Sequence, residues 1–249
     1  MKHTDAIVSP ETFKAQGYCV EEGFLTPEEC DELLGRIAQY RAAHEVPEVY
    51  RKVRGRSLHY FVIDGHQVEQ HLPAIWRLYE QVNAVVDKTC GRALEPLENR
   101  RVGANVNITP PGGEYRWHYD RNAVTGIIYL NEVQGGETEL YPHFRLRLRQ
   151  RYSTLQRWLD RLLQAAPVRR IFGHHVMVAP RRGSIVLMQG NTCLHSVRPV
   201  GGETDRINII LAYDEPGAHF AIEKNLDTYL YTEAEQASSD PNYVGSQDA

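Results

Sequence analysis

The stretch Tyr115-Arg116-Trp117-His118-Tyr119-Asp120 decides how this sequence is expected to fold and what it can bind. Its residues predict a strand, and residues two apart on a strand point to the same face of a sheet. His118 and Asp120 are therefore expected side by side, and a later predicted strand carries His195. Two imidazoles and one carboxylate can coordinate a divalent metal ion from one side and leave its other coordination positions open.

Short predicted strands lie on both sides of this stretch, separated by turns that contain Gly, Pro or Asn. They cover residues 101–108, 115–120, 123–131, 137–141, 176–179, 184–189, 195–200 and 206–213. Many short strands that follow two helices predict a mainly β fold. The expected architecture is an antiparallel double-sheet barrel of jelly-roll type, with the N-terminal helices packed on it.

The first hundred residues are expected to support this barrel. Two helices are predicted there, at residues 27–43 and 72–90, and two short strands, at 17–25 and 58–63. Thr26 and Glu29 have the spacing of a capping box at the start of the first helix. Gly91 directly follows the second helix and is expected to end it. Residues 44–70 are otherwise expected to be irregular.

Residues 143–182 interrupt the strand pattern and contain ten arginines, no lysine and one acid, Asp160. Helical spacing within this insert is shown by Leu155, Trp158, Leu159, Leu162 and Leu163. The simplest interpretation is a solvated basic face with a helix packed by its Leu and Trp side chains. Because the insert lies between the two parts of the candidate metal site, a substrate lid or a docking patch for an acidic partner is the alternative.

The chain is expected to form a single domain over residues 1–249. Residues 1–100 form the supporting part, 101–213 the barrel with its insert, and 214–249 a polar tail whose end, 238–249, is expected to be mobile. The division rests on the change of pattern near Arg101, where alternating apolar residues begin.

The bulk composition is that of an ordinary globular protein, with a net charge of −4 and no apolar run of membrane-spanning length. It gives no reason to expect nucleic acid or a membrane as a partner. Residues 1–10 lack the apolar core of a signal peptide. The four scattered cysteines, Cys19, Cys30, Cys90 and Cys193, are expected to be reduced. We therefore expect a cytoplasmic protein.

The set of motifs resembles a known family. It comprises Tyr115 to Asp120, Ile128-Tyr129-Leu130-Asn131, Gly135-Gly136-Glu137-Thr138-Glu139, His195 and Arg206. Over roughly residues 100–213 the sequence resembles the 2-oxoglutarate/Fe(II)-dependent dioxygenases of the prolyl-4-hydroxylase-like branch. The resemblance implies a double-stranded β-helix fold, and His118, Asp120 and His195 as catalytic iron ligands. It also implies that Arg206 holds the distal carboxylate of 2-oxoglutarate.

Elementary chemistry agrees with these implied roles. A lone guanidinium at the head of a buried apolar strand needs an anion, and a carboxylate is its natural bidentate partner. The cofactors implied are Fe(II), 2-oxoglutarate as co-substrate and O2, with ascorbate as a candidate reductant. Succinate and CO2 would be the products formed from 2-oxoglutarate.

The sequence departs from the family at one position. Several relatives have a Tyr nine residues before the first ligand, and this chain has Thr109. The contacts to the oxo acid are therefore open between Asn107, Tyr129 and Thr138, with Asn208 as a helper of Arg206.

Three features of the sequence bear on the type of reaction and on the substrate. Halogenases of this superfamily lack the carboxylate ligand, so Asp120 favours hydroxylation or a related oxidation. No second arginine shortly follows Arg206, whereas nucleic-acid demethylases carry one there. Arg198 is a candidate for binding a substrate carboxylate, although a surface position is the simpler interpretation.

The expected function is hydroxylation, or another oxidation, of an unactivated C–H bond in a small molecule such as an amino acid or natural-product intermediate. A hydroxylase acting on a peptidyl residue or on a substrate tethered to a carrier protein is the alternative. A non-enzymatic jelly-roll module that binds or senses a metal is the second alternative. The sequence does not specify the substrate, the position and stereochemistry of oxidation, or the oligomeric state.

Overall fold

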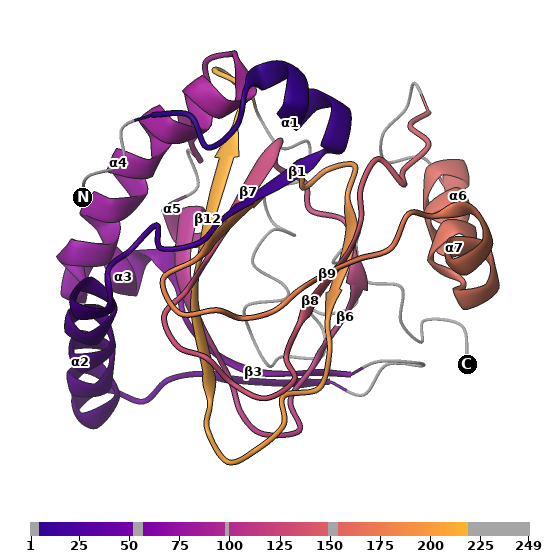
Figure 1. Cartoon of the computed structure of the whole chain (residues 1–249). Helices are drawn as coiled ribbons and strands as arrows, with labels where there is room; N and C mark the ends of the chain where they lie inside the picture. The colour runs from indigo at the N-terminus through magenta and orange to yellow at the C-terminus, as the bar shows by residue number, and fades with distance from the viewer. Residues whose placement is uncertain (1–4, 52–56, 98–99, 149–153, 219–249) are drawn as a thin grey trace.

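The computed structural model describes residues 5–51, 57–97, 100–148 and 154–218, which fold into two facing antiparallel sheets (Figure 1). The larger sheet contains, in spatial order, β1 (Tyr18–Glu21), β10 (Ile185–Met188), β7 (Val124–Tyr129), β12 (Arg206–Asp214), β5 (Ala104–Thr109), β3 (Leu58–Ile63) and β2 (Glu48–Arg51), with β4 (Glu95–Pro96) paired to β12. The smaller sheet contains β6 (Tyr115–His118), β11 (Leu194–Val197), β8 (Thr138–Tyr141) and β9 (Val176–Val178). From β9 onward consecutive strands alternate between the two sheets, which is the connectivity of a jelly roll. The predicted mainly β, double-stranded β-helix core is confirmed.

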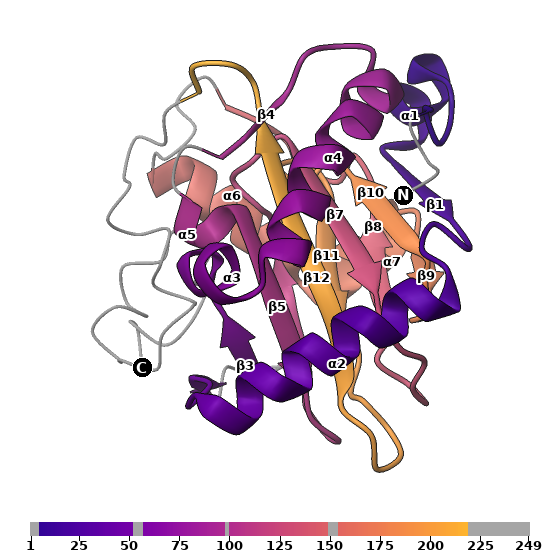
Figure 2. The ribbon, with the colours of Figure 1, turned by 90° about the vertical axis from the view of Figure 1, so that its left-hand side faces the viewer.

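Helices cover the outer face of the larger sheet, as Figure 2 shows. They are α1 (Pro10–Gln16), α2 (Pro27–Ala43), α3 (Gly65–His71) and α4 (Pro73–Cys90), and a short α5 (Arg100–Gly103) precedes β5. The α4 helix buries a stripe that includes Ile75, Leu78, Val82 and Val86. This stripe belongs to the same core as the outward-facing residues of the sheet, because side chains alternate along a strand and one face is free for the helices.

The opposite face of the larger sheet looks toward the smaller sheet and carries polar residues. On β12 the side chains of Arg206, Asn208, Ile210 and Ala212 line a cavity between the sheets, whereas Ile209 belongs to the helix-side core. On the neighbouring strand β5, residues 105, 107 and 109 line the same cavity. The period of two therefore places every functional candidate of these two strands on the inner face.

Local signals in the N-terminal part are confirmed. Thr26 accepts a hydrogen bond from the Glu29 N–H, and the Glu29 side chain accepts one from the Thr26 N–H, which completes the capping box of α2. Gly91 adopts the left-handed conformation (φ 65°) that ends α4. The strand-like patch at residues 58–63 is β3.

Three boundaries differ from the prediction. Residues 44–70 are more ordered than expected, because they include β2 and α3 as well as β3. Residues 101–103, predicted as strand, form the end of α5. The strand predicted over 115–120 ends at His118, so Asp120 lies just beyond β6.

The insert forms two helices, α6 (Thr154–Gln164) and α7 (Ala166–Phe172), at the edge of the smaller sheet (Figure 1). The expected mobile end, residues 238–249, lies outside the described residues. Among the residues that the structure describes, no helix combines the length and apolar composition needed to cross a membrane. The four cysteines are free thiols, as expected.

Candidate metal centre and its cavity

Two neighbouring strands and one strand end bring His118, Asp120 and His195 together. β6 pairs with β11 in a register that places His118 opposite His195, and their rings lie 4.0 Å apart between centroids. The Asp120 Oδ1 atom lies 3.4 Å from Nε2 of His118 and 3.5 Å from Nε2 of His195. One ligand atom from each residue lies within 4.8 Å of the other two. Three donors this close, two nitrogens and one oxygen, could share one metal ion.

The backbone fixes which nitrogen of each imidazole faces the centre. Nδ1 of His118 lies 3.0 Å from the carbonyl oxygen of Arg116, and Nδ1 of His195 lies 3.0 Å from that of Cys193. A carbonyl can only accept, so Nδ1 of each ring donates and carries the proton of the neutral ring. Both Nε2 atoms are therefore left with lone pairs for a metal.

Asp120 is held by residues that the sequence did not single out. Thr125 Oγ1 donates to Asp120 Oδ2 over 2.6 Å, and Asn122 Nδ2 in turn donates to Thr125 Oγ1 over 2.9 Å. The Asp120 N–H donates to the carbonyl of Gly190. A Cβ at Gly190 would lie 2.6 Å from Thr125 Oγ1, so only glycine leaves room for this arrangement. Oδ2 is thus occupied by the hydroxyl and Oδ1 is presented to the imidazoles.

The side chains of Asp120, His118 and His195 shift each other's pKa values. Burial alone would raise the pKa of Asp120, but the charge of His195 and the close contacts with both imidazoles lower this pKa well below its usual range. Burial, followed by the charge of His195, lowers the pKa of His118. Burial would also lower the pKa of His195, yet Asp120 outweighs it and raises that pKa. The carboxylate is therefore charged at any working pH.

The Thr125→Val substitution should weaken Mn(II) or Fe(II) binding about 10- to 100-fold, the usual effect of losing a hydrogen bond to a metal ligand. Valine keeps the shape of threonine and removes only the hydroxyl that fixes Asp120. The measurement is a metal titration followed by electron paramagnetic resonance for Mn(II). Thr89→Val is the matched control, because Thr89 is also fully buried but lies on α4. Equal affinities for Thr125→Val and wild type would show that the hydroxyl does not orient the ligand.

Metal affinity should rise with pH and then level off. A metal binds only the deprotonated Nε2, so each proton displaced makes the affinity depend tenfold on each pH unit. The raised pKa of His195 extends this dependence above the ordinary histidine value of about 6.5. Asp120 adds nothing, because its lowered pKa keeps it ionised throughout. Mn(II) titrations from about pH 5.5 to 8 test this, and an affinity that does not change over the range would be inconsistent with histidine ligands.

Arg206 lies at the other end of the same cavity, fully surrounded by protein. Its guanidinium donates to Asn208 Oδ1 and to Thr138 Oγ1, the latter over 3.1 Å, and its Cζ lies 5.0 Å from the centre of the Tyr129 ring. Tyr129 and Thr138 share a hydrogen bond of 2.6 Å between their hydroxyls. Asn107 pairs in register with Asn208 and lines the cavity beside it. The structure thus brings all five predicted oxo-acid residues together.

This cluster fits a carboxylate. Burial lowers the pKa of Arg206, but a guanidinium stays protonated in proteins. Within the described residues no acid forms an ion pair with Arg206, and its Nε has no hydrogen-bond partner. Asn107 Oδ1 is also buried without a partner there. A buried cation with unused donors is costly unless an anion binds it, and a small acid reaching from here to the metal centre satisfies that need.

The rest of the cavity is mostly apolar. Its wall on the β3 side is formed by Tyr60, Leu97, Val102, Tyr115 and Ala212. Asn105 and Arg116 add polar groups to this wall. Arg198, the candidate for a substrate carboxylate, lies outside the cavity lining, with its side chain 45% exposed and its Nε 3.8 Å from Glu137.

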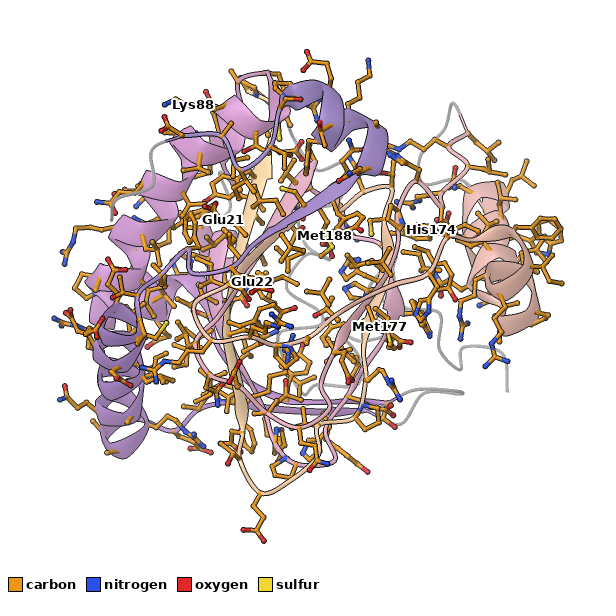
Figure 3. The ribbon with its side chains drawn as sticks, viewed as in Figure 1. Glu21, Glu22, Lys88, His174, Met177 and Met188 are labelled. Atoms are coloured by element: carbon orange, nitrogen blue, oxygen red, sulfur yellow. The ribbon has the colours of Figure 1, made fainter. Side chains whose placement is uncertain are left out.

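Trp117 and Tyr119, which flank the candidate ligands, contact Tyr141 of the barrel wall and the start of the insert. The Tyr119 hydroxyl donates to the Phe144 carbonyl over 2.7 Å, and the Trp117 ring packs against Tyr141. Cys193 is buried, and burial raises the pKa of its thiol, so it is a packing residue. Met188 of β10 lies between the sheets, whereas His174 lies near α6 and α7 (Figure 3).

Comparison with known proteins gives one family match. Residues 104–213 match the model of the 2OG-Fe(II) oxygenase superfamily. No curated protein matches the chain in sequence.

Many solved structures share the fold at low sequence identity. The epimerase SnoN from nogalamycin biosynthesis, described as non-heme and alpha ketoglutarate dependent, is 16% identical, with a TM-score of 0.64 over 83% of this chain and 79% of its own. AviO1 from Streptomyces viridochromogenes Tue57 is 19% identical, with a TM-score of 0.63 over 89% and 100% of the two chains. A prolyl-4-hydroxylase from Pseudomonas putida is 19% identical, with a TM-score of 0.53 over 84% and 97%. The covered shares of 83–89% of this chain are larger than residues 104–213 alone.

Proposed function

We propose that this chain, whose residues 104–213 match the model of the 2OG-Fe(II) oxygenase superfamily, hydroxylates, or otherwise oxidises, an unactivated C–H bond of a small molecule. The observation that carries the proposal is the joint presence, in one cavity, of a three-ligand metal centre and a buried arginine without an acidic partner among the described residues. A metal-binding module alone would not need Arg206.

Each residue has a distinct task in this proposal. His118, Asp120 and His195 hold Fe(II), and Arg206 binds the distal carboxylate of 2-oxoglutarate, assisted by Thr138 and Asn208. When bound, Fe(II) would supply the oxidising chemistry, with 2-oxoglutarate and O2 as co-substrates and succinate and CO2 as products. The larger sheet aligns the metal centre with Arg206. Asn208 and Ala212 of β12 pair with Tyr129 and Thr125 of β7. Arg206 and Thr125, which holds Asp120, therefore lie along one rigid pair of strands.

The apolar wall of Tyr60, Leu97, Val102, Tyr115 and Ala212 is where the substrate would lie. It can exclude water from the metal centre and hold an apolar part of the substrate, while Asn105 and Arg116 offer polar contacts. Structural neighbours include proteins described as an epimerase and a carbocyclase from nogalamycin biosynthesis. Several outcomes of the oxidation are therefore compatible with this fold, and hydroxylation is the simplest of them.

A protein-linked substrate, peptidyl or held on an acidic carrier, is the second candidate function. One structural neighbour is a prolyl hydroxylase in complex with a peptide fragment of hypoxia inducible factor. The arginine-rich insert could dock such a partner, although Arg145 is not a free docking group because it forms a bidentate ion pair with Asp160. Arg170 is exposed and suits a test. If Arg170→Glu leaves turnover of every protein-linked substrate unchanged, this candidate loses its structural support.

The proposed chemistry is tested by incubating the full chain with Fe(II), 2-oxoglutarate, ascorbate and O2, and measuring succinate. Enzymes of this kind are expected to form some succinate without substrate, and a metabolite screen should raise the rate further. No succinate with any metabolite or peptide, despite stoichiometric metal binding, would instead support a metal-binding or sensor module.

A further inference from the structure

The α6 helix of the insert presents its polar side to the protein and its apolar side to solvent. Gln156 is 2% exposed and Asp160 is 7% exposed, whereas Leu155, Trp158 and Leu162 are 61%, 59% and 43% exposed. A surface helix normally shows the reverse pattern. The expectation that the Leu and Trp side chains pack this helix against the barrel is therefore wrong for these three residues.

Specific contacts hold α6 in this orientation. Asp160 accepts two hydrogen bonds from Arg145, and Gln156 bonds to the backbone of Leu146 and Leu148. The Arg145 guanidinium also lies 4.7 Å from the centre of the Tyr119 ring. A buried ion pair with this many partners orients a helix strongly, because turning α6 over would leave Asp160 and Arg145 unpaired.

The neighbouring helix extends the exposed apolar surface. Ile171 and Phe172 at the end of α7 are 72% and 75% exposed. We call Leu155, Trp158, Leu162, Ile171 and Phe172 the apolar face of the insert. Large exposed apolar side chains on two helices that contact each other indicate a binding surface. Two described arginines of these helices, Arg161 and Arg170, are exposed, and the one acid of the insert, Asp160, is already paired with Arg145.

The chain itself contains a segment with matching chemistry. Residues 219–249 contain six acids and a single cation, Lys224. Their apolar residues include Ile222, Leu226, Tyr229 and Leu230, which recur at the spacing of one helix face. An acidic amphipathic segment complements a basic surface with an apolar centre in both charge and hydrophobicity.

The segment begins close to the start of the insert. Ala218 lines a groove together with His143 and Arg147 from the start of the insert. Arg121 lines both this groove and the metal cavity. The 31 residues that follow Ala218 would span about 100 Å if extended and about 45 Å as a helix. Either length is at least comparable with the width of a domain of this size, so the segment can reach α6 and α7 from Ala218.

We propose that residues 219–249 bind intramolecularly to the apolar face of the insert. The segment would cover Trp158 and its neighbours, and its acids would face the insert arginines. Tethering gives such a segment an effective concentration in the millimolar range, so weak contacts suffice. The inference concerns a surface outside the metal cavity and does not depend on the proposed oxidation.

Trypsin provides a direct test on the full chain. Lys224 is the one cleavage site within residues 219–249, and cleavage after it releases a fragment that mass spectrometry identifies. Cleavage there should be at least about tenfold slower in wild type than in a Trp158→Ser/Leu162→Ser variant, because a protease reaches only the unbound segment. A Leu226→Ser/Leu230→Ser variant should be equally fast, and combining the two pairs should add little. High salt should also accelerate cleavage of the wild type.

Tyr50→Ser is the matched control, since Tyr50 is an exposed aromatic residue (53%) on β2. It should leave cleavage after Lys224 at the wild-type rate. The proposal fails if the Trp158 variant and wild type are cleaved equally fast. It also fails if protection increases with protein concentration alongside a doubled mass in sedimentation, because the occupant would then be a second copy.

Discussion

Asp120→Asn should reduce succinate formation by about two orders of magnitude or more while leaving the protein folded. Asparagine keeps the size of aspartate and a hydrogen-bonding group toward Thr125, so the local packing is preserved. It removes the negative charge that offsets the metal and replaces a carboxylate ligand by a neutral amide oxygen. The loss should therefore appear in metal binding and turnover together. The measurement is Fe(II)-dependent succinate release, with Mn(II) titration in parallel.

The matched control is Asp31→Asn, which removes a carboxylate that is 70% exposed and paired with Arg182 on the surface. It should retain wild-type turnover and metal affinity. Thermal unfolding in excess chelator at alkaline pH, which favours neutral imidazoles, should give similar midpoints for wild type and Asp120→Asn. Added metal should raise the midpoint of wild type only, because a ligand stabilises a protein in proportion to its affinity for the folded state. Wild-type metal affinity in Asp120→Asn would refute the assignment of Asp120 as a ligand.

The parts of the fold that the sequence predicted are those governed by contacts between near neighbours. The Thr26–Glu29 capping box spans three residues and needs nothing else to form. Gly91 ends α4 because it is free to adopt positive φ. The alternation on β12 sorts Arg206 and Asn208 from Ile209 without knowledge of the neighbouring strand. Where such local rules apply, prediction and structure agree.

The parts that could not be predicted depend on tertiary contacts. Asp120 leaves the strand because its N–H bonds to the carbonyl of Gly190, which is 70 residues away in the chain. Thr125 became a candidate only when the fold placed its hydroxyl on Asp120. Periodicity revealed that α6 is amphipathic, but not which side faces the protein. That choice is made by the ion pair between Arg145 and Asp160.

The candidate site also contains a part that the sequence predicted and a part that it did not. The sequence named His118, Asp120 and His195, and the structure places their ligand atoms within 4.8 Å of one another. It also named Arg206 and four polar neighbours, and β5, β7, β8 and β12 bring these to one end of the cavity. The apolar wall of the cavity was not predicted, because it combines side chains such as Tyr60 and Leu97 from elements outside the quoted motifs. Motifs carry the chemistry shared by a family, whereas the wall depends on the whole fold.

Arg206→Met should raise the 2-oxoglutarate concentration needed for half-maximal succinate formation by about 30-fold or more. Removing one partner of a buried, hydrogen-bonded charge pair costs about 2–5 kcal/mol, and each 1.4 kcal/mol is a factor of ten in affinity. Methionine is apolar and flexible enough to fill part of the space, so the cavity should not collapse. Iron affinity should change little, because Arg206 contacts none of the three metal-site residues in the structure. Arg198→Met is the matched control, since Arg198 is half-exposed outside the cavity.

The stability of Arg206→Met separates a co-substrate role from a structural one. Arg206 is buried, and no described acid pairs with it, so the ligand-free protein bears the cost of an uncompensated cation. Replacing it by Met should leave the thermal midpoint without 2-oxoglutarate unchanged or higher, despite the lost hydrogen bonds to Thr138 and Asn208. Added 2-oxoglutarate with Mn(II) should then raise the midpoint of wild type but not of the variant. A variant that unfolds several degrees earlier without ligand, yet keeps the wild-type response to 2-oxoglutarate, would show that Arg206 stabilises the barrel and that another residue binds the carboxylate.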